Sequence, residues 1–125
     1  MNGISLDAGG LIALDRNDRR VLVLIARTME SGMRVTVPAT ALAQAIRNPG
    51  KQARLSRLIR QAGTDLVALD ARDATAVGLL LARTGTPDIA DAHVAVCAQR
   101  AGQAVVTSDP DDLKRIGPEL SLVEI

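Results

Sequence analysis

The feature that most restricts the fold of this chain is the alternation of short apolar runs with longer segments of helical periodicity. The runs predicted to be strands are 4–7, 34–38, 65–69, 104–107 and 120–124. The segments predicted to be helices are 11–14, 21–29, 39–47, 51–62, 71–83, 86–100 and 109–116. Strands that alternate with helices favour a mostly parallel sheet with helices on both faces. The sequence therefore predicts a three-layer α/β domain with four or five strands.

The size of the chain and its apolar content support one domain over residues 1–125. With 125 residues, it lies within the usual range for a single domain. Hydrophobic residues make up 47% and charged residues 23%, so the chain can bury a core without disulfide bonds. Phe, Tyr and Trp are absent, which predicts an aliphatic core and excludes nucleic-acid modules that stack bases on aromatic rings.

Three further features indicate the cellular setting. Cys97 is the only cysteine, which excludes a disulfide framework or a cysteine-based zinc site within one chain. The first residues lack a basic and apolar leader pattern. No run approaches the roughly 18 apolar residues of a membrane span. We expect a cytoplasmic protein that does not interact with a membrane.

Charge is distributed unevenly along the chain. The net charge of +1 is too small for a protein that coats DNA by bulk electrostatics. Between residues 47 and 60 there are only basic charges, whereas residues 88–112 carry five aspartates and a single arginine. The pattern predicts an acidic site beside a basic flank. This flank either contacts phosphate groups of a nucleic acid or forms an ordinary solvated face, and its arginines are Arg47, Arg54, Arg57 and Arg60.

Three aspartates stand where a parallel sheet places its ligands. Asp7 ends the first predicted strand, Asp109 follows the fourth, and Asp91 lies in the first turn of the helix before it. If the first and fourth strands are neighbours, these carboxylates meet at one edge of the sheet. Clustered carboxylates stay ionised near neutral pH when a divalent cation offsets their repulsion, and oxygen ligands favour Mg²⁺ or Mn²⁺. The predicted chemistry is the hydrolysis of a phosphate ester.

Neighbouring polar residues have simpler interpretations as well. Asp88 and Asp112 either support the ligands or interact with a helix dipole, and Thr107 either contacts a metal-bound water or is an ordinary strand-end hydroxyl. Asp109 also stands where it could cap the helix that follows. For the preceding helix, the sequence predicts Thr86 as the N-cap.

Other candidates are predicted to be structural. His93 has no partner at metal-binding spacing, so a packed or surface position is favoured over a general base. Cys97 is expected to be a small buried hydrophobe. The aspartates expected at strand ends and helix caps are Asp65, Asp70 and Asp73.

Four short motifs in this order resemble a known family. They are Leu6-Asp7-Ala8, Val37-Pro38-Ala39-Thr40, Asp91-Ala92-His93-Val94-Ala95, and residues 106–113 around Thr107-Ser108-Asp109. This pattern is similar to that of the PIN-domain ribonucleases and, more narrowly, of VapC-type toxins from bacterial toxin–antitoxin pairs. The resemblance implies that Asp7, Asp91 and Asp109 are metal-binding catalytic acids. It also implies an RNA substrate, a cognate antitoxin that inhibits the enzyme, and a homodimer.

One position departs from the family pattern. Where the family usually places a glutamate in the helix after the second strand, this chain has Gln44. The amide can still offer a carbonyl oxygen to a metal or its water, but it carries no charge. We therefore expect weaker metal binding if Gln44 assists the three aspartates.

Three other classes compete with a nuclease. One is a PIN-like binding module that is weakened at position 44 and acts through a protein partner. A phosphoacceptor receiver domain is disfavoured because the loop after Asp7 lacks a second acid, although Asp70 is an acceptor candidate. A haloacid-dehalogenase-like phosphatase is disfavoured because Gly9 stands where its second aspartate is needed. Site geometry must decide among these, since fold alone does not define function.

Overall fold

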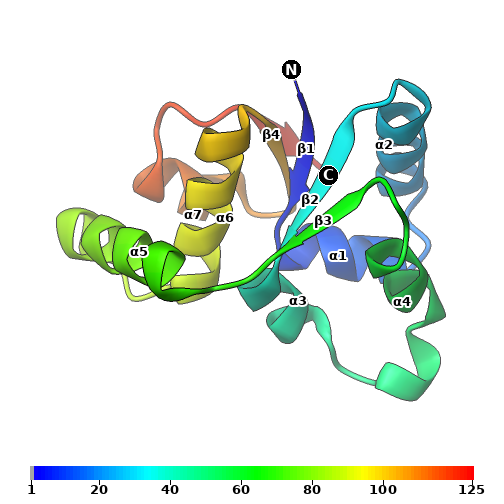
Figure 1. Cartoon of the computed structure of the whole chain (residues 1–125), viewed down its shortest axis with the longest axis horizontal. Coiled ribbons are helices and arrows are strands. Elements are labelled where there is room, and N and C mark those ends of the chain that lie inside the picture. Colours follow the sequence, from blue (N-terminus) through cyan, green and yellow to red (C-terminus); the bar gives the residue numbers. More distant parts are fainter. Residues whose placement is uncertain (1) are drawn as a thin grey trace.

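A computed structural model describes residues 2–125 and contains one five-stranded sheet whose strands are all parallel (Figure 1). The strands are β1 (Gly3–Leu6), β2 (Arg34–Pro38), β3 (Thr64–Val67), β4 (Ala104–Thr107) and β5 (Leu122–Glu124). Their order across the sheet is β3-β2-β1-β4-β5. The prediction of a parallel α/β sheet is confirmed. The first strand pairs with the fourth, which is the condition under which the aspartates were expected to meet.

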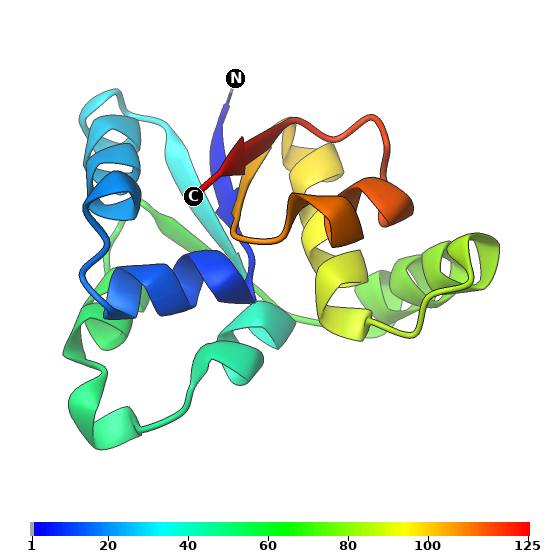
Figure 2. The ribbon, with the colours of Figure 1, turned by 180° about the vertical axis from the view of Figure 1, so that it is seen from behind.

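Helices cover both faces of the sheet. They are α1 (Ala8–Asp15), α2 (Arg19–Glu30), α3 (Ala39–Ala45), α4 (Ala53–Ile59), α5 (Ala71–Thr84), α6 (Ile89–Ala101) and α7 (Pro110–Ile116), with a 3₁₀ turn at Pro49–Lys51. Figures 1 and 2 show α1, α2 and α4 on one side of the strands and α5, α6 and α7 on the other. The chain runs outward from β1 to β3 and returns to β4, and right-handed crossovers place the returning helices on the opposite face. Over residues 2–125, no helix combines the length and apolar character that a bilayer-spanning segment requires.

The core is aliphatic, as the composition predicts. The central strands β1, β2 and β4 are almost entirely buried, because helices cover both of their faces. Residues of these strands that are fully shielded from solvent include Leu6, Val35, Val37, Val105 and Val106. Leu6 pairs with Val106 in the ladder, and the Asp7 N–H donates to the Val106 carbonyl at 3.4 Å. This register brings Asp7, which follows β1, and Thr107, the last residue of β4, to the same edge of the sheet.

The predicted start of α6 is wrong. The helix predicted to begin just after Thr86, with Thr86 as its N-cap, begins at Ile89 with Asp88 as its N-cap. The Thr86 hydroxyl instead accepts a hydrogen bond from the Asp88 N–H at 3.2 Å.

The segments predicted as helices 39–47 and 51–62 are also shorter in the structure, because Gln52 is buried between α3 and α4. Its amide donates to the Ala45 carbonyl at 2.9 Å and accepts from the Arg47 and Asn48 N–H groups. These bonds satisfy backbone groups at the end of α3 that a longer helix would have used.

Candidate metal centre

Asp7 occupies the end of β1 and caps α1. Its Oδ1 accepts a hydrogen bond from the Gly10 N–H at 2.7 Å, and the Thr107 hydroxyl donates to the same carboxylate. The residue is only 5% exposed. Burial raises the pKa of Asp7 above its ordinary value, and the nearby charge of Asp109 raises it further, whereas the hydrogen bonds oppose this effect. Asp7 is therefore a fixed, buried carboxylate whose charge is incompletely compensated.

The two glycines after Asp7 allow α1 to begin against the end of β4. A Cβ atom at Gly10 would lie 2.9 Å from the Val106 carbonyl oxygen, and a Cβ atom at Gly9 would collide with the Ser108 hydroxyl. Larger residues at these positions would push the helix N-terminus away from the neighbouring strand. The sequence Asp-Ala-Gly-Gly thus brings the cap of α1 next to the loop that carries Asp109.

Asp91 reaches the same edge of the sheet from the first turn of α6. The cap residue Asp88 accepts from the Asp91 N–H through its Oδ1 at 2.9 Å, which places the two carboxyl groups close together. Burial raises the pKa of Asp91 to about 7, and the charges of Asp88, Asp7 and Asp112 contribute in that order. The direct influence of Asp7 and Asp112 on Asp91 means that β1, α6 and α7 meet here.

Asp109 and Asp112 complete the acidic group from the start of α7. The Asp109 N–H donates to the Thr107 Oγ1 at 2.9 Å, and Asp109 stands at the N-cap position without a side-chain cap bond. A hydrogen bond between the two carboxyl groups raises the pKa of Asp112, and the charge of Asp109 adds to this effect. The two carboxyl groups therefore lie close together at the start of α7.

The structure therefore brings together the five aspartates that the sequence predicts as metal ligands or their supports. We call Asp7, Asp88, Asp91, Asp109 and Asp112 the acidic cluster. Neighbouring acids of the cluster contribute to the raised pKa of Asp7, Asp91 and Asp112. No three of these aspartates have carboxylate oxygens that all lie within 4.8 Å of one another. Among residues 2–125, the group that meets this distance is Asp73, His93 and Cys97.

Gln44 lies on the exposed side of α3, beside the acidic cluster. It lines a pocket of about 680 Å³ together with Thr40 on its own helix and Asp88 on the opposite wall. The amide thus faces the space in front of the cap of α6. This is the position at which the sequence departs from the family pattern.

The predicted basic flank lies apart from the acids. Its four arginines are exposed, and they follow α3 or lie on and just after α4. Both views place α3 between α4 and the N-terminal end of α6 (Figures 1 and 2). The structure does not bring Arg47, Arg54, Arg57 or Arg60 into the acidic cluster, and their contact with RNA stays a prediction.

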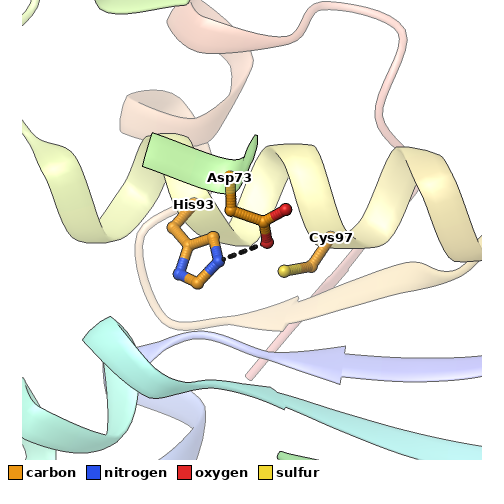
Figure 3. A group of neighbouring side chains, drawn as sticks. All are labelled: Asp73, His93 and Cys97. Atoms are coloured by element: carbon orange, nitrogen blue, oxygen red, sulfur yellow. Dashed lines mark hydrogen bonds and ion pairs between the residues drawn. The ribbon is translucent and has the colours of Figure 1, made fainter. Parts of the chain in front are cut away.

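A buried polar network between α5 and α6 was not foreseen (Figure 3). Asp70 caps α5 as expected, but the prediction that Asp73 is a cap or strand-end residue is wrong. Asp73 is buried, with Arg100 bound to its two oxygens at 2.8 and 2.9 Å and His93 Nε2 at 3.0 Å. The Arg100 guanidinium, with help from His93, holds the pKa of Asp73 well below its ordinary value, although burial opposes this.

His93 and Cys97 are packed inside the protein, as predicted. The prediction that His93 lacks a potential metal-binding partner is wrong. Its ring lies beside both Asp73 and Cys97. The four-residue spacing of His93 and Cys97 along one helix is the signal that could have revealed part of this group. The partner Asp73 comes from another helix, and no local spacing indicates it.

Comparison with known proteins identifies the class to which this fold and site belong. The family model of the PIN domain matches residues 6–118. The chain belongs to the PIN-domain family, whose members are generally nucleases.

Solved structures of the same fold include chains of two VapBC complexes. One is VapBC2 from Rickettsia felis, bound to a DNA fragment from their promoter, with 16% identity, a TM-score of 0.71 and 98% of each chain covered. The other is DNA-bound VapBC from Salmonella typhimurium, with 19% identity, a TM-score of 0.70 and coverage of 99% of this chain and 98% of that one. FitAcB from Neisseria gonorrhoeae matches with 16% identity, a TM-score of 0.62 and coverage of 97% and 96%. No curated protein matches the chain by sequence.

Proposed function

We propose that this protein is a metal-dependent endoribonuclease and the toxin of a toxin–antitoxin pair. The observation that carries the proposal is the convergence of five aspartates from β1, α6 and the β4–α7 connection at one edge of the sheet. That edge lies outside the carboxyl ends of β1 and β4, where the strand order reverses direction. Parallel sheets bind their ligands at such points. Membership of a family of nucleases supports a phosphodiester as the bond that is hydrolysed.

The residues present fit a hard divalent cation. The donors are carboxylate oxygens, which suit Mg²⁺ or Mn²⁺ better than a softer metal. Asp7 and Asp91 have raised pKa values because each is buried near other acids, and positive charge placed between them would relieve that repulsion. We assign Asp7, Asp91 and Asp109 as its ligands. When bound, the cation would lower the pKa of a water molecule and stabilise negative charge on the phosphodiester.

Other residues of the site hold these ligands in place. Thr107 donates to the Asp7 carboxylate and accepts from the Asp109 N–H, so one buried hydroxyl links two of the ligands. Asp88 fixes the first turn of α6 through its bond to the Asp91 N–H. Asp112 lies beside Asp109 and offers a further carboxylate oxygen to the site. We assign these three residues a positioning role.

A specific observation also favours a second candidate function. Gln44 lines the pocket beside Asp88 but contributes no charge, so the cation is attracted less strongly than by a glutamate. A PIN-like module with weak metal binding could act by holding a protein partner instead of cleaving RNA. Activity measured in the presence of Mn²⁺ distinguishes the two functions.

The proposed partners are a cognate antitoxin, an RNA substrate and a second copy of the chain. The VapBC and FitAcB complexes, which share this fold, support a small protein partner. The exposed arginines of the basic flank are the proposed contacts to RNA phosphates. We place this activity in the cytoplasm.

The proposal is tested with purified, untagged protein and a labelled RNA in Mn²⁺ or Mg²⁺. We expect cleavage that EDTA abolishes and that Asp7→Asn and Asp91→Asn reduce by at least a hundredfold. Asp65→Asn is the matched control, since Asp65 forms an exposed ion pair with Arg34 at 2.6 Å on β3, away from the acidic cluster. Wild-type activity should survive this change.

Two results would overturn the nuclease proposal. One is the absence of metal-dependent cleavage in the wild type at any Mn²⁺ concentration, which would favour the binding module. The other is cleavage that Asp7→Asn and Asp91→Asn leave intact, which would indicate a contaminating nuclease.

A further inference from the structure

The Asp73–His93–Cys97 group brings three different ligand types together in the interior. His93 and Cys97 are one helical turn apart on α6, and Asp73 faces them from α5 (Figure 3). Their ligand atoms all lie within 4.8 Å of one another, and the side chains of Asp73 and His93 are 4% and 0% exposed. Ligands arranged tetrahedrally around Zn²⁺ lie roughly 3.3–3.7 Å apart, so small side-chain movements would close the set around one ion.

Groups around these three residues already hold them as metal ligands are usually held. The Thr40 hydroxyl lies 2.8 Å from His93 Nδ1, the ring nitrogen that faces away from Asp73. Arg100 donates to Asp73 Oδ1 at 2.8 Å and also interacts with the Cys97 sulfur. A histidine whose second nitrogen is hydrogen-bonded and a carboxylate held by a further donor are typical of protein metal sites.

We propose that Asp73, His93 and Cys97 form a second metal site, which binds a thiophilic divalent cation such as Zn²⁺. The single cysteine excludes a site built from several cysteines, but here Cys97 supplies one thiolate beside a nitrogen of His93 and a carboxylate oxygen of Asp73. This mixed set suits such an ion, whereas the all-oxygen acidic cluster suits Mg²⁺ or Mn²⁺. The two sites therefore select different metals. The inference is independent of the nuclease proposal, because it rests only on the ligand set between α5 and α6.

Binding changes the protonation of the group in a defined way. In the metal-free state His93 Nε2–H donates to Asp73 Oδ2, at 3.0 Å. With the ion bound, the ring proton lies on Nδ1 and is donated to Thr40 Oγ1, which frees Nε2 to bind the metal. The thiol proton of Cys97 leaves to solvent. Gain of the dication and loss of this proton leave the group, with the Arg100 guanidinium still paired to Asp73, carrying one net positive charge.

The competing interpretation is a purely structural network. Asp73 already has Arg100 and His93 as partners, so the group is stable without a metal. The two interpretations differ in one measurable respect: only a metal site forms a bond between a cation and the sulfur of Cys97.

Co²⁺ is the probe that detects this bond. Untagged, metal-free protein under reducing conditions is titrated with Co²⁺, and thiolate-to-cobalt charge-transfer absorption is followed in the near ultraviolet. Cys97 is the only cysteine and is buried, so such a band has a single source within the chain. We expect a band that saturates at one Co²⁺ per chain and disappears when excess Zn²⁺ is added.

Variants show which residues give rise to the charge-transfer band. It should be absent in Cys97→Ser, reduced at least tenfold in apparent affinity in Asp73→Asn, and unchanged in Asp7→Asn, which alters the acidic cluster only. Circular dichroism of each metal-free variant shows whether it is folded. If Cys97→Ser does not fold, the wild-type titration still decides the matter, because no other thiol exists in the chain. Absence of a charge-transfer band in the wild type, or its persistence in folded Cys97→Ser, would overturn the proposal.

Discussion

Replacement of Asp91 by asparagine should stabilise the metal-free protein, although it removes a proposed metal ligand. Burial and the neighbouring acids raise the pKa of Asp91 from its ordinary 3.8 to about 7. The folded state therefore binds a proton more tightly than the unfolded state does. Stability contributed by this proton is fully present below about pH 4, is lost as the pH rises, and is gone above about pH 7.

The size of the effect follows from the same pKa values. At roughly 1.4 kcal/mol for each tenfold change in proton affinity, the rise from 3.8 to about 7 sets an upper bound of about 4 kcal/mol. Asp91 is only half-buried, and solvent screening reduces this to about 2 kcal/mol. Because asparagine is never charged, Asp91→Asn should raise the free energy of unfolding by about 2 kcal/mol at about pH 8 and leave it nearly unchanged at about pH 4.

Urea unfolding in EDTA provides the assay. Far-ultraviolet circular dichroism is the appropriate signal, since the chain has no tryptophan or tyrosine for fluorescence. Asp65→Asn is the control, because Arg34 lowers the pKa of Asp65 and its replacement should give no stabilisation at high pH. A variant Asp91→Asn that is equally destabilised at both pH values would refute the reasoning. Added Mn²⁺ should stabilise the wild type more than Asp91→Asn.

Three further outcomes are expected. Gln44→Glu should tighten Mn²⁺ binding about fivefold to tenfold in calorimetric titration, since it adds one negative charge beside the acidic cluster; identical isotherms would show that this side chain does not act on the metal. Gly10→Ala should lower the free energy of unfolding in urea by about 1–3 kcal/mol, because the added Cβ meets the Val106 carbonyl. Gly78 lies in open space on α5, so Gly78→Ala should raise the free energy of unfolding by about 0.5–1 kcal/mol. Equal effects of the two glycine substitutions would contradict this account of the α1–β4 contact. Replacement of Arg54, Arg57 and Arg60 by alanine should weaken RNA binding and make its affinity less dependent on salt concentration. An unchanged salt dependence would show that these arginines form only a solvated face.

The sheet and the meeting of the acids could be predicted because both follow from local patterns. Short β-branched runs such as Arg34–Pro38 indicate strands, and the alternation with helices indicates their parallel direction. Asp7 stands directly after β1 and Asp109 two residues after the end of β4, so the strand order determines whether they meet. Helix ends were harder to predict, because two residues close together in the sequence are both suitable N-caps: Asp88, and not Thr86, caps α6.

The network around Asp73 could not be predicted, because its partners are distant along the chain. Asp73 has the spacing of an ordinary first-turn acid, and only the packing of α5 against α6 buries it next to His93 and Arg100. Likewise, the sequence shows a basic segment, but it does not show that α3 separates α4 from the acidic cluster. Contacts between residues of different helices depend on how the helices pack, and the spacing of residues along a single sequence does not show that packing.

The most direct test of this account is to locate Mn²⁺ by anomalous diffraction in crystals of the wild-type protein soaked with the ion. The account predicts an anomalous peak bound by carboxylate oxygens of Asp7, Asp91 and Asp109, and no such peak in Asp7→Asn crystals. A wild-type peak elsewhere, or a well-ordered acidic cluster with no peak at saturating Mn²⁺, would contradict the claim that these aspartates form a metal centre.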